Sequence, residues 1–173
     1  MKTSVFIATS LDGYIARKDG GLDWLPENPE PHGYEEFFAS VDAVVIGRGT
    51  YETVLGFGGW AYGKKPVVVL TSDPAKIRPP EGAVCEAMSG DPREIAGRLE
   101  KRGWKHVYVD GGVTITRFLE AGLIDRMTIT RIPVLLGGGM PLFGGLTGDV
   151  RFRHEWTKWF PSGMVQSEYS RSR

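Results

Sequence analysis

The residues Gly47, Arg48, Gly49 and Thr50 place two glycines, a cation and a hydroxyl between an aliphatic run at 44–46 and a segment that could open a helix. Glycines allow a ligand to approach the backbone, and the free amides of a helix N-terminus bind anions. A guanidinium and a hydroxyl add further donors for phosphate oxygens. These residues therefore predict a phosphate site, although an ordinary strand-to-helix turn explains them equally well.

A second glycine pair stands at the same kind of junction. Residues 107–109 are typical of the end of a buried strand, and Asp110, Gly111 and Gly112 lead from them into a predicted helix. Ligands of open parallel sheets bind beyond the carboxyl ends of the strands, where glycines permit close approach. Two such junctions in one sheet favour a shared ligand site over two ordinary connections.

Three carboxylates are candidates for a place near a possible pocket: Asp12, Asp23 and Glu27. Asp12 precedes Gly13 and is more typical of a turn than of a catalyst. Asp23 stands beside Trp24, and an aromatic neighbour can raise the pKa of a carboxyl group by desolvation. Asp23 is therefore the first candidate for a proton donor and Glu27 the second, while Trp24 could form a wall of a pocket.

Other kinds of chemistry have weaker support. The three histidines share no spacing typical of metal ligands, so no metal site is expected. No serine stands in a G-x-S-x-G motif, and Cys85 lies in the segment AVCEA, which argues against covalent catalysis. The hydroxyls of Thr71 and Ser72 follow a third apolar run, although such residues are also common in turns.

Length and composition favour one globular domain. The chain has 173 residues, of which 41% are hydrophobic and 24% charged, and these values are close to the globular average. Lys plus Arg and Asp plus Glu each total 21, so nothing in the net charge favours nucleic acid as a partner. The single cysteine excludes an intrachain disulfide and favours the cytoplasm. No apolar stretch has the length of a signal-peptide core or a membrane span.

Local patterns predict the elements that must position the candidate residues. Short runs rich in apolar and β-branched residues at 3–9, 41–46, 66–71 and 106–109 are typical of strands. The last three are too continuous for a sheet with one exposed face, so they indicate central strands that are covered on both sides.

Helices are predicted between these strands, as a strand-helix-strand arrangement requires. The clearest begins with Asp91 as its N-cap, has Pro92 at its first position and ends at Gly103. A shorter helix is predicted at 114–122. The sequence thus indicates an α/β fold.

The last third of the chain changes in character. Residues 126–136 are typical of another strand, and residues 150–160 and 164–171 of two long strands that a turn joins into a hairpin. Two irregular segments, the proline-rich 26–33 and the glycine-rich 137–148, are the kind of loop that borders a site.

Six motifs, read in order, resemble the dihydrofolate reductase superfamily. They are ATSLDGYIA, LDWLP, VVIGRGTYE, VVVLTS, YVDGGVTI and PVLLGGGMPLF. The resemblance is strongest to the reductase domain of riboflavin-biosynthesis proteins, the RibD C-terminal domain, and to its stand-alone relatives. It covers nearly the whole chain, and its most specific parts are the S-L-D-G turn and the G-R-x-T and D-G-G junctions.

The resemblance implies a single domain over residues 1–173 with a three-layer α/β/α fold. Its central sheet would be mostly parallel and would end in the antiparallel hairpin. NADPH would bind across the strand ends, with Arg48 and Thr50 at its phosphates and with Thr71 and Ser72 beside the adenosine 2′-phosphate.

The resemblance also implies the remaining contacts. Gly111 and Gly112 would approach the pyrophosphate, and the backbones of Ala8 and Ile15 would hold the nicotinamide carboxamide. The implied cofactor-binding residues are Ala8, Ile15, Gly47, Arg48, Thr50, Thr71, Ser72, Gly111, Gly112 and Thr114. The implied substrate-binding residues are Leu11, Asp12, Trp24, Leu136, Gly137 and Gly138.

The implied activity is hydride transfer from NADPH to a small heterocycle, with a reductase of the 5-amino-6-(5-phosphoribosylamino)uracil type as the first candidate. A pterin is second, because the position of the pterin-binding carboxylate of dihydrofolate reductases is held by Asn28. A sensor that binds NADPH without turnover is a third possibility. Since the zinc-deaminase motifs H-x-E and P-C-x-x-C are missing, no deaminase activity is expected. A homodimer is expected, with Trp156 and Trp159 of the hairpin in its interface.

Overall fold

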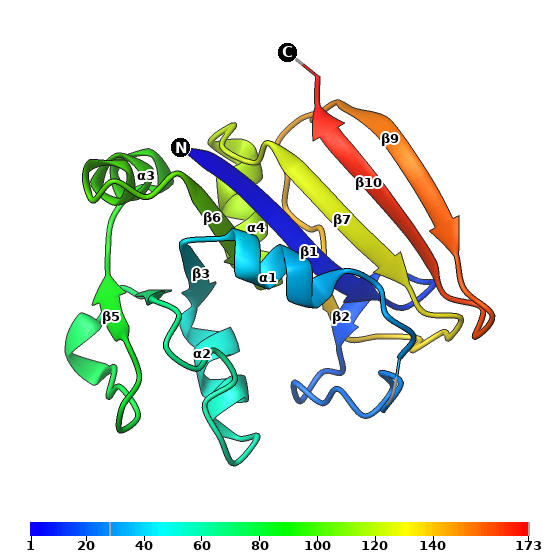
Figure 1. Cartoon of the computed structure of the whole chain (residues 1–173), viewed down its shortest axis with the longest axis horizontal. Coiled ribbons are helices and arrows are strands. Elements are labelled where there is room, and N and C mark those ends of the chain that lie inside the picture. The colour runs from blue at the N-terminus through cyan, green and yellow to red at the C-terminus, as the bar shows by residue number, and fades with distance from the viewer. Residues whose placement is uncertain (28, 173) are drawn as a thin grey trace.

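A computed structural model describes residues 1–27 and 29–172 of the chain. Its main feature is an eight-stranded sheet with the order β5-β4-β3-β6-β1-β7-β10-β9 (Figure 1). The strands of this sheet are β1 (Lys2–Thr9), β3 (Ala43–Gly47), β4 (Val67–Leu70), β5 (Cys85–Met88), β6 (His106–Asp110), β7 (Arg126–Arg131), β9 (Phe152–Trp159) and β10 (Val165–Arg171). Two short strands, β2 (Tyr14–Ala16) and β8 (Met140–Pro141), form a separate antiparallel ribbon.

The pairing of the strands confirms a mostly parallel sheet with an antiparallel end. All neighbours from β5 to β7 are parallel. In contrast, β10 is antiparallel to β7 and to β9, which closes the predicted hairpin. The carboxyl ends of β3, β6 and β1 therefore meet at one edge of the sheet, and this edge carries the residues of interest.

Four helices cover the two faces of the sheet. They are α1 (Tyr34–Ser40), α2 (Arg48–Leu55), α3 (Pro92–Lys101) and α4 (Gly112–Glu120), and a 3₁₀ turn, η1 (Pro74–Lys76), follows β4. Successive side chains of a strand point to opposite faces. Val44 and Ile46 accordingly pack with α1 and α2, whereas Val45 packs with α3 and α4. Because both faces are covered, the predicted continuous apolar runs and the three-layer fold are confirmed.

The structure also shows why some elements escape sequence analysis. Helix α1 has no side-chain cap and starts after Gly33, which adopts a positive φ of 84°. Strand β5, with the sequence CEAM, carries no β-branched residue and is held at the sheet edge by its pairing with β4. In contrast, α3 begins as predicted, since the Asp91 side chain accepts a hydrogen bond from the Arg93 amide at 2.8 Å.

Strand β7 ends at Arg131 and is therefore shorter than predicted. Pro133 follows two residues later, and a proline cannot donate a hydrogen bond to the next strand. Among the described residues, no helix combines the length and the apolar character needed to cross a membrane.

Candidate functional site

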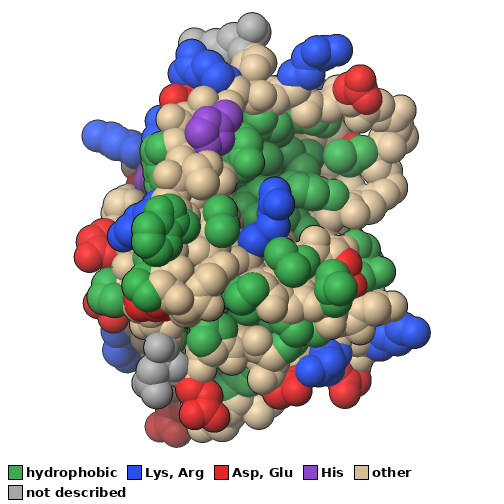
Figure 2. Space-filling model, turned by 90° about the vertical axis from the view of Figure 1, so that its right-hand side faces the viewer, with side chains coloured by type: hydrophobic (Ala, Val, Ile, Leu, Met, Phe, Trp, Pro, Cys, Tyr) green, Lys and Arg blue, Asp and Glu red, His purple; other side chains and the backbone are tan. Residues whose placement is uncertain are grey.

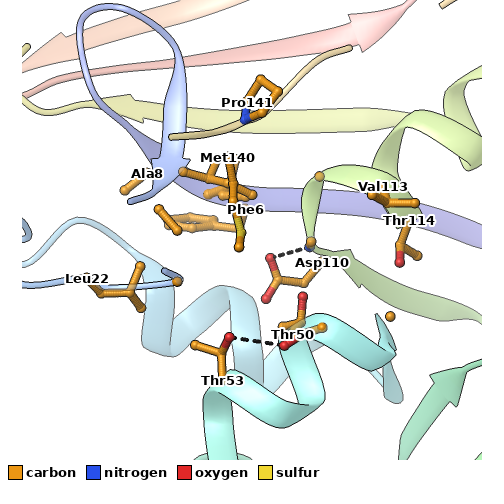
Figure 3. Close-up of a pocket in the computed structure, with 18 of the residues that line it drawn as sticks. Phe6, Ala8, Leu22, Thr50, Thr53, Asp110, Val113, Thr114, Met140 and Pro141 are labelled. Carbon is orange, nitrogen blue, oxygen red and sulfur yellow. Dashed lines mark hydrogen bonds between the residues drawn. The ribbon is translucent and has the colours of Figure 1, made fainter. Parts of the chain in front are cut away.

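A cavity of about 980 Å³ lies at the carboxyl edge of the sheet (Figure 3). Its walls come from β1, β2 and β8, from the starts of α2 and α4, from the loop between β2 and α1, and from the neighbouring ends of β7 and β10. Eight of the ten residues that the resemblance assigns to the cofactor line it: Ala8, Ile15, Gly47, Arg48, Thr50, Gly111, Gly112 and Thr114.

The two glycine junctions pack directly against each other. A Cβ atom on Gly47 would lie 2.8 Å from the Thr114 hydroxyl oxygen, and one on Gly111 would overlap the hydroxyl of Thr50. Gly111 also has a positive φ of 92°, which favours glycine. The glycines therefore let the starts of α2 and α4 stand side by side at the cavity.

Both helix starts are suited to an anion. Neither Gly47 nor Gly111, the N-cap residues of α2 and α4, provides a side-chain cap, so the first amides of these helices are available to a ligand. Those amides also carry the partial positive charge of the helix dipole. The Thr50 hydroxyl lies among them and points into the cavity (Figure 3).

A second hollow, of about 630 Å³, adjoins the first at the ends of β4 and β5. It contains Thr71 and Ser72, the other two residues that the resemblance assigns to the cofactor, and it shares Arg48 and Arg117 with the main cavity. Arg48 Nε lies 3.5 Å from the Glu52 carboxylate, and Arg117 donates to the Gly90 carbonyl at 3.1 Å. Two guanidinium groups thus border the region where the cavities meet.

Arg117 was not among the residues that the sequence singled out. A spacing argument points to it, because it follows Val113, which lines the cavity, by four residues and therefore shares its helix face.

Asp110 is the second site residue that sequence reasoning missed, since it was considered only as part of the D-G-G junction between a strand and a helix. Its carboxyl group points into the cavity toward Thr50 (Figure 3), and its Oδ1 accepts a hydrogen bond from the Gly111 amide at 2.8 Å. Burial raises the pKa of Asp110 to about 6, against the opposing effect of the Gly111 amide. Among the described lining residues it is the single carboxylate.

Asp110 should lower the stability of the protein at neutral pH. Its pKa rises from 3.8 to about 6 on folding, so the stability that the protonated group provides is present below about pH 4 and lost as the pH rises through about 6. Replacing Asp110 by asparagine should raise the free energy of unfolding by up to about 3 kcal/mol at about pH 8 and change it little at about pH 4. Urea denaturation at both pH values measures this. An equal change in the free energy of unfolding at both pH values would contradict the prediction. Asp149→Asn, at an exposed position, serves as the control.

The predicted proton donors lie outside the cavity. Asp23 is exposed and forms a bidentate ion pair with Arg17, at 2.6 and 3.0 Å, which lowers the pKa of Asp23. Trp24 does not shield it but packs against a cluster that contains Phe160. The expected rise in the pKa of Asp23 is therefore wrong. Glu27 is also exposed and does not line the cavity.

Three of the predicted substrate residues, Asp12, Leu136 and Gly137, take part in hydrogen bonds that hold two loops together. Asp12 accepts hydrogen bonds from the Ser10 hydroxyl at 2.6 Å and from the amides of Leu136 and Gly137 at 3.1 and 2.7 Å. These bonds tie the glycine-rich loop to the turn after β1. None of the six substrate-binding residues assigned by resemblance (Leu11, Asp12, Trp24, Leu136, Gly137 and Gly138) lines the cavity.

Nearby residues of the same two segments form the wall instead: Ile15, Ala16, Gly20 and Leu22 from the first, and Gly139 with Met140 from the second. Residues of both segments thus border one cleft. Asn28, at the position of the pterin-binding carboxylate, lies outside the described residues.

A mostly parallel sheet with a cavity at its carboxyl edge and a terminal hairpin defines a dihydrofolate reductase-like fold. The dihydrofolate reductase of Enterococcus faecalis, solved in complex with NADP(H) and RAB-propyl, has this fold, with a TM-score of 0.70 at 22% identity over 99% of this chain and 97% of that one. Residues 2–165 match the RibD C-terminal domain family, and the chain belongs to this family.

Two further structures agree with this assignment. A protein of Shewanella sp. PV-4, provisionally described as a riboflavin biosynthesis protein, is 42% identical over the full length of both chains, with a TM-score of 0.89. The deaminase and 5-amino-6-(5-phosphoribosylamino)uracil reductase of Thermotoga maritima shares the fold, with a TM-score of 0.74 at 16% identity over 99% of this chain and 56% of that one. The resemblance inferred from the motifs is confirmed.

Proposed function

We propose that this protein is an NADPH-dependent reductase that acts on a small heterocycle. The observation that carries the proposal is the composition of the cavity, which joins two uncapped helix starts and two arginines to an apolar chamber. A dinucleotide with charged phosphates and a flat nicotinamide needs both environments. Membership of a riboflavin-biosynthesis reductase family supports the same activity.

The residues present suit NADPH. The starts of α2 and α4 would hold the pyrophosphate, and Arg48 and Arg117 would bind the 2′-phosphate together with the hydroxyls of Thr71 and Ser72. The strand end at Ala8 lies in the same cavity (Figure 3), where its backbone would orient the nicotinamide carboxamide.

Bound NADPH supplies a hydride from C4 of its dihydronicotinamide ring to a C=O or C=N carbon, and a proton completes the alcohol or amine product. The side chains of Phe6, Leu22 and Met140 would exclude water from the reacting atoms. Asp110 is the carboxyl group placed to hold that proton, because it faces the chamber and has a pKa of about 6.

The test is the oxidation of NADPH by purified protein with a panel of substrates. Ribosylaminopyrimidines come first, because a family relative is named for that reduction, and dihydropterins come second. Oxidation that requires both protein and substrate supports the proposal. Tight NADPH binding without turnover of any panel member would support the sensor instead, and no NADPH binding would exclude both. The single cysteine, which can form no intrachain disulfide, supports a cytoplasmic location as part of the proposal.

The C-terminal hairpin supports the proposed homodimer. Strand β9 lies at the edge of the sheet, and its Trp159 and Trp156 are 75% and 40% exposed. Figure 2 shows this side of the molecule, where hydrophobic side chains gather around a shallow hollow. Isolated proteins seldom leave such an edge open, since it can pair with another chain.

Replacing Trp159 by serine should therefore convert a dimer into a folded monomer, because the side chain contributes little within one chain. Sedimentation velocity measures the association, and circular dichroism confirms the fold. Phe57→Ser, at another exposed position, should leave the dimer intact. A monomeric wild-type protein would contradict the proposal.

A further inference from the structure

The cationic side chains of the main cavity lie at one end. Among its described lining residues, Arg48 and Arg117 are the only arginines or lysines, and they belong to α2 and α4. In the proposed function this end holds the phosphates of the cofactor. The opposite end lies beside the end of β7 and the start of β10. We call it the substrate end, because the substrate would bind there.

The substrate end is built mainly from apolar side chains, among them Leu22, Leu25, Ile132 and Met164. Its polar group from the sheet, the Thr130 hydroxyl, already accepts a hydrogen bond from the buried Gln166 side chain at 2.9 Å. The described part of this end therefore offers no fixed cation to a ligand.

Arg48 and Arg117 lie too far from the substrate end to bind a substrate phosphate there. In the sheet order, three strand spacings separate β3, which precedes Arg48, from β7, which precedes Ile132. At about 4.8 Å for each spacing, these strand ends lie roughly 14 Å apart. A substrate phosphate bound by these arginines would thus compete with the phosphates of the cofactor. It could not belong to a substrate whose ring lies in the apolar chamber.

Two groups of the chamber can instead recognise a polar ring edge. Asp110 already accepts hydrogen bonds from the Gly111 amide, at Oδ1, and from the Tyr108 side chain. Because a carboxylate has about four acceptor sites, it can still accept a hydrogen bond from a ligand. His32 donates from Nδ1 to the Glu30 carbonyl at 3.0 Å, so its Nε2 is an acceptor in the neutral ring. Its ring centroid lies 5.8 Å from that of Phe6. These acceptors and aromatic surfaces suit a flat ring with N–H groups.

A phosphate monoester is poorly suited to the substrate end of the cavity. It carries a charge of about −1.5 to −2 at neutral pH, and burial without a cation removes its hydration without compensation. When Asp110 is ionised, the repulsion between like charges adds to this cost.

We infer that, if the protein is the proposed reductase, its substrate is a planar, uncharged heterocycle with N–H donors and without a phosphate group. The ring lies between Phe6 and the apolar chamber and presents its N–H edge to Asp110 and His32. This separates the protein from reductases that act on phosphoribosyl substrates.

The test compares matched ligands on protein saturated with NADP⁺. The probes are two pairs that differ by one phosphate: 5-amino-6-ribosylaminouracil with its 5′-phosphate, and 7,8-dihydroneopterin with its 3′-phosphate. Calorimetry should show that the phosphate-free member of at least one pair binds ten times more tightly or better. Tighter binding of the phosphates, equal binding within each pair, or no binding of any probe would each overturn the inference. Failure of NADP⁺ itself to bind would instead overturn the proposed function.

A charge-insertion variant provides a second measurement. Pro26 is exposed and lines the substrate end, whereas Pro31 is exposed in the same loop and does not line the cavity. Pro26→Lys should improve the binding of the phosphorylated probes about tenfold, as one charge-assisted contact provides. Pro31→Lys should leave it unchanged. An equal response of the two variants would contradict the placement of the substrate end.

Discussion

Replacing Arg48 by alanine is expected to weaken NADPH binding by roughly 10- to 150-fold and to change NADH binding much less. A charge-assisted hydrogen bond contributes about 1.5–3 kcal/mol, and about 1.4 kcal/mol corresponds to a factor of ten in affinity. Arg48 lies where the main cavity meets the hollow that contains Thr71 and Ser72, the proposed place of the 2′-phosphate. NADH lacks this phosphate, so it loses little.

Calorimetric titration of both cofactors into the wild-type protein and the variant measures the difference. Arg93→Ala is the matched control, because Arg93 is exposed on α3 and lines neither cavity. Equal losses for NADPH and NADH would show that Arg48 binds a phosphate common to both. No loss for either would identify the junction as an ordinary turn.

A variant at Arg117 provides a second test of the proposed 2′-phosphate site. Arg117 borders the same region from α4, so Arg117→Ala should also reduce the preference for NADPH. If both arginines bind one phosphate, the loss in the double variant should differ from the sum of the single losses.

Asp110→Asn is expected to lower kcat by roughly 100-fold or more, the usual contribution of a positioned acid or base. Because the pKa of Asp110 is raised to about 6 by burial, the protonated donor is lost above that value. Turnover of the wild-type protein should therefore fall as the pH rises through about 6, and the profile of the variant should be flat in this range. Steady-state kinetics from about pH 5 to pH 8 measure both effects.

Asp23→Asn distinguishes the structure-based assignment from the one suggested by the sequence. Asp23 is exposed and paired with Arg17, so its replacement should leave the pH profile as it is. A profile that changes in Asp23→Asn and not in Asp110→Asn would show that the proton passes through the loop after β2, and it would exclude Asp110 as the donor.

The strands and the clearest helix could be predicted because their causes are local. Uninterrupted aliphatic runs such as 44–46 require two covered faces, and Asp91 with Pro92 starts a helix wherever the chain goes next. Among the elements that escaped prediction, α1 and β5 have weak local preferences and are held by packing or pairing with distant parts of the chain.

The sequence by itself determined the two glycine junctions, because the close packing at Gly47 and Gly111 and the positive φ of Gly111 favour glycine. The order of the motifs determined the family. Only the tertiary structure decided which charged groups surround the cavity. The sequence neighbours Asp23 and Trp24 do not form the expected shielded pair. Trp24 packs against the cluster that contains Phe160, and Arg17 forms the ion pair with Asp23. Burial depends on how distant elements pack, so the raised pKa of Asp110 and the position of Arg117 at the same two cavities as Arg48 became visible only in the folded chain.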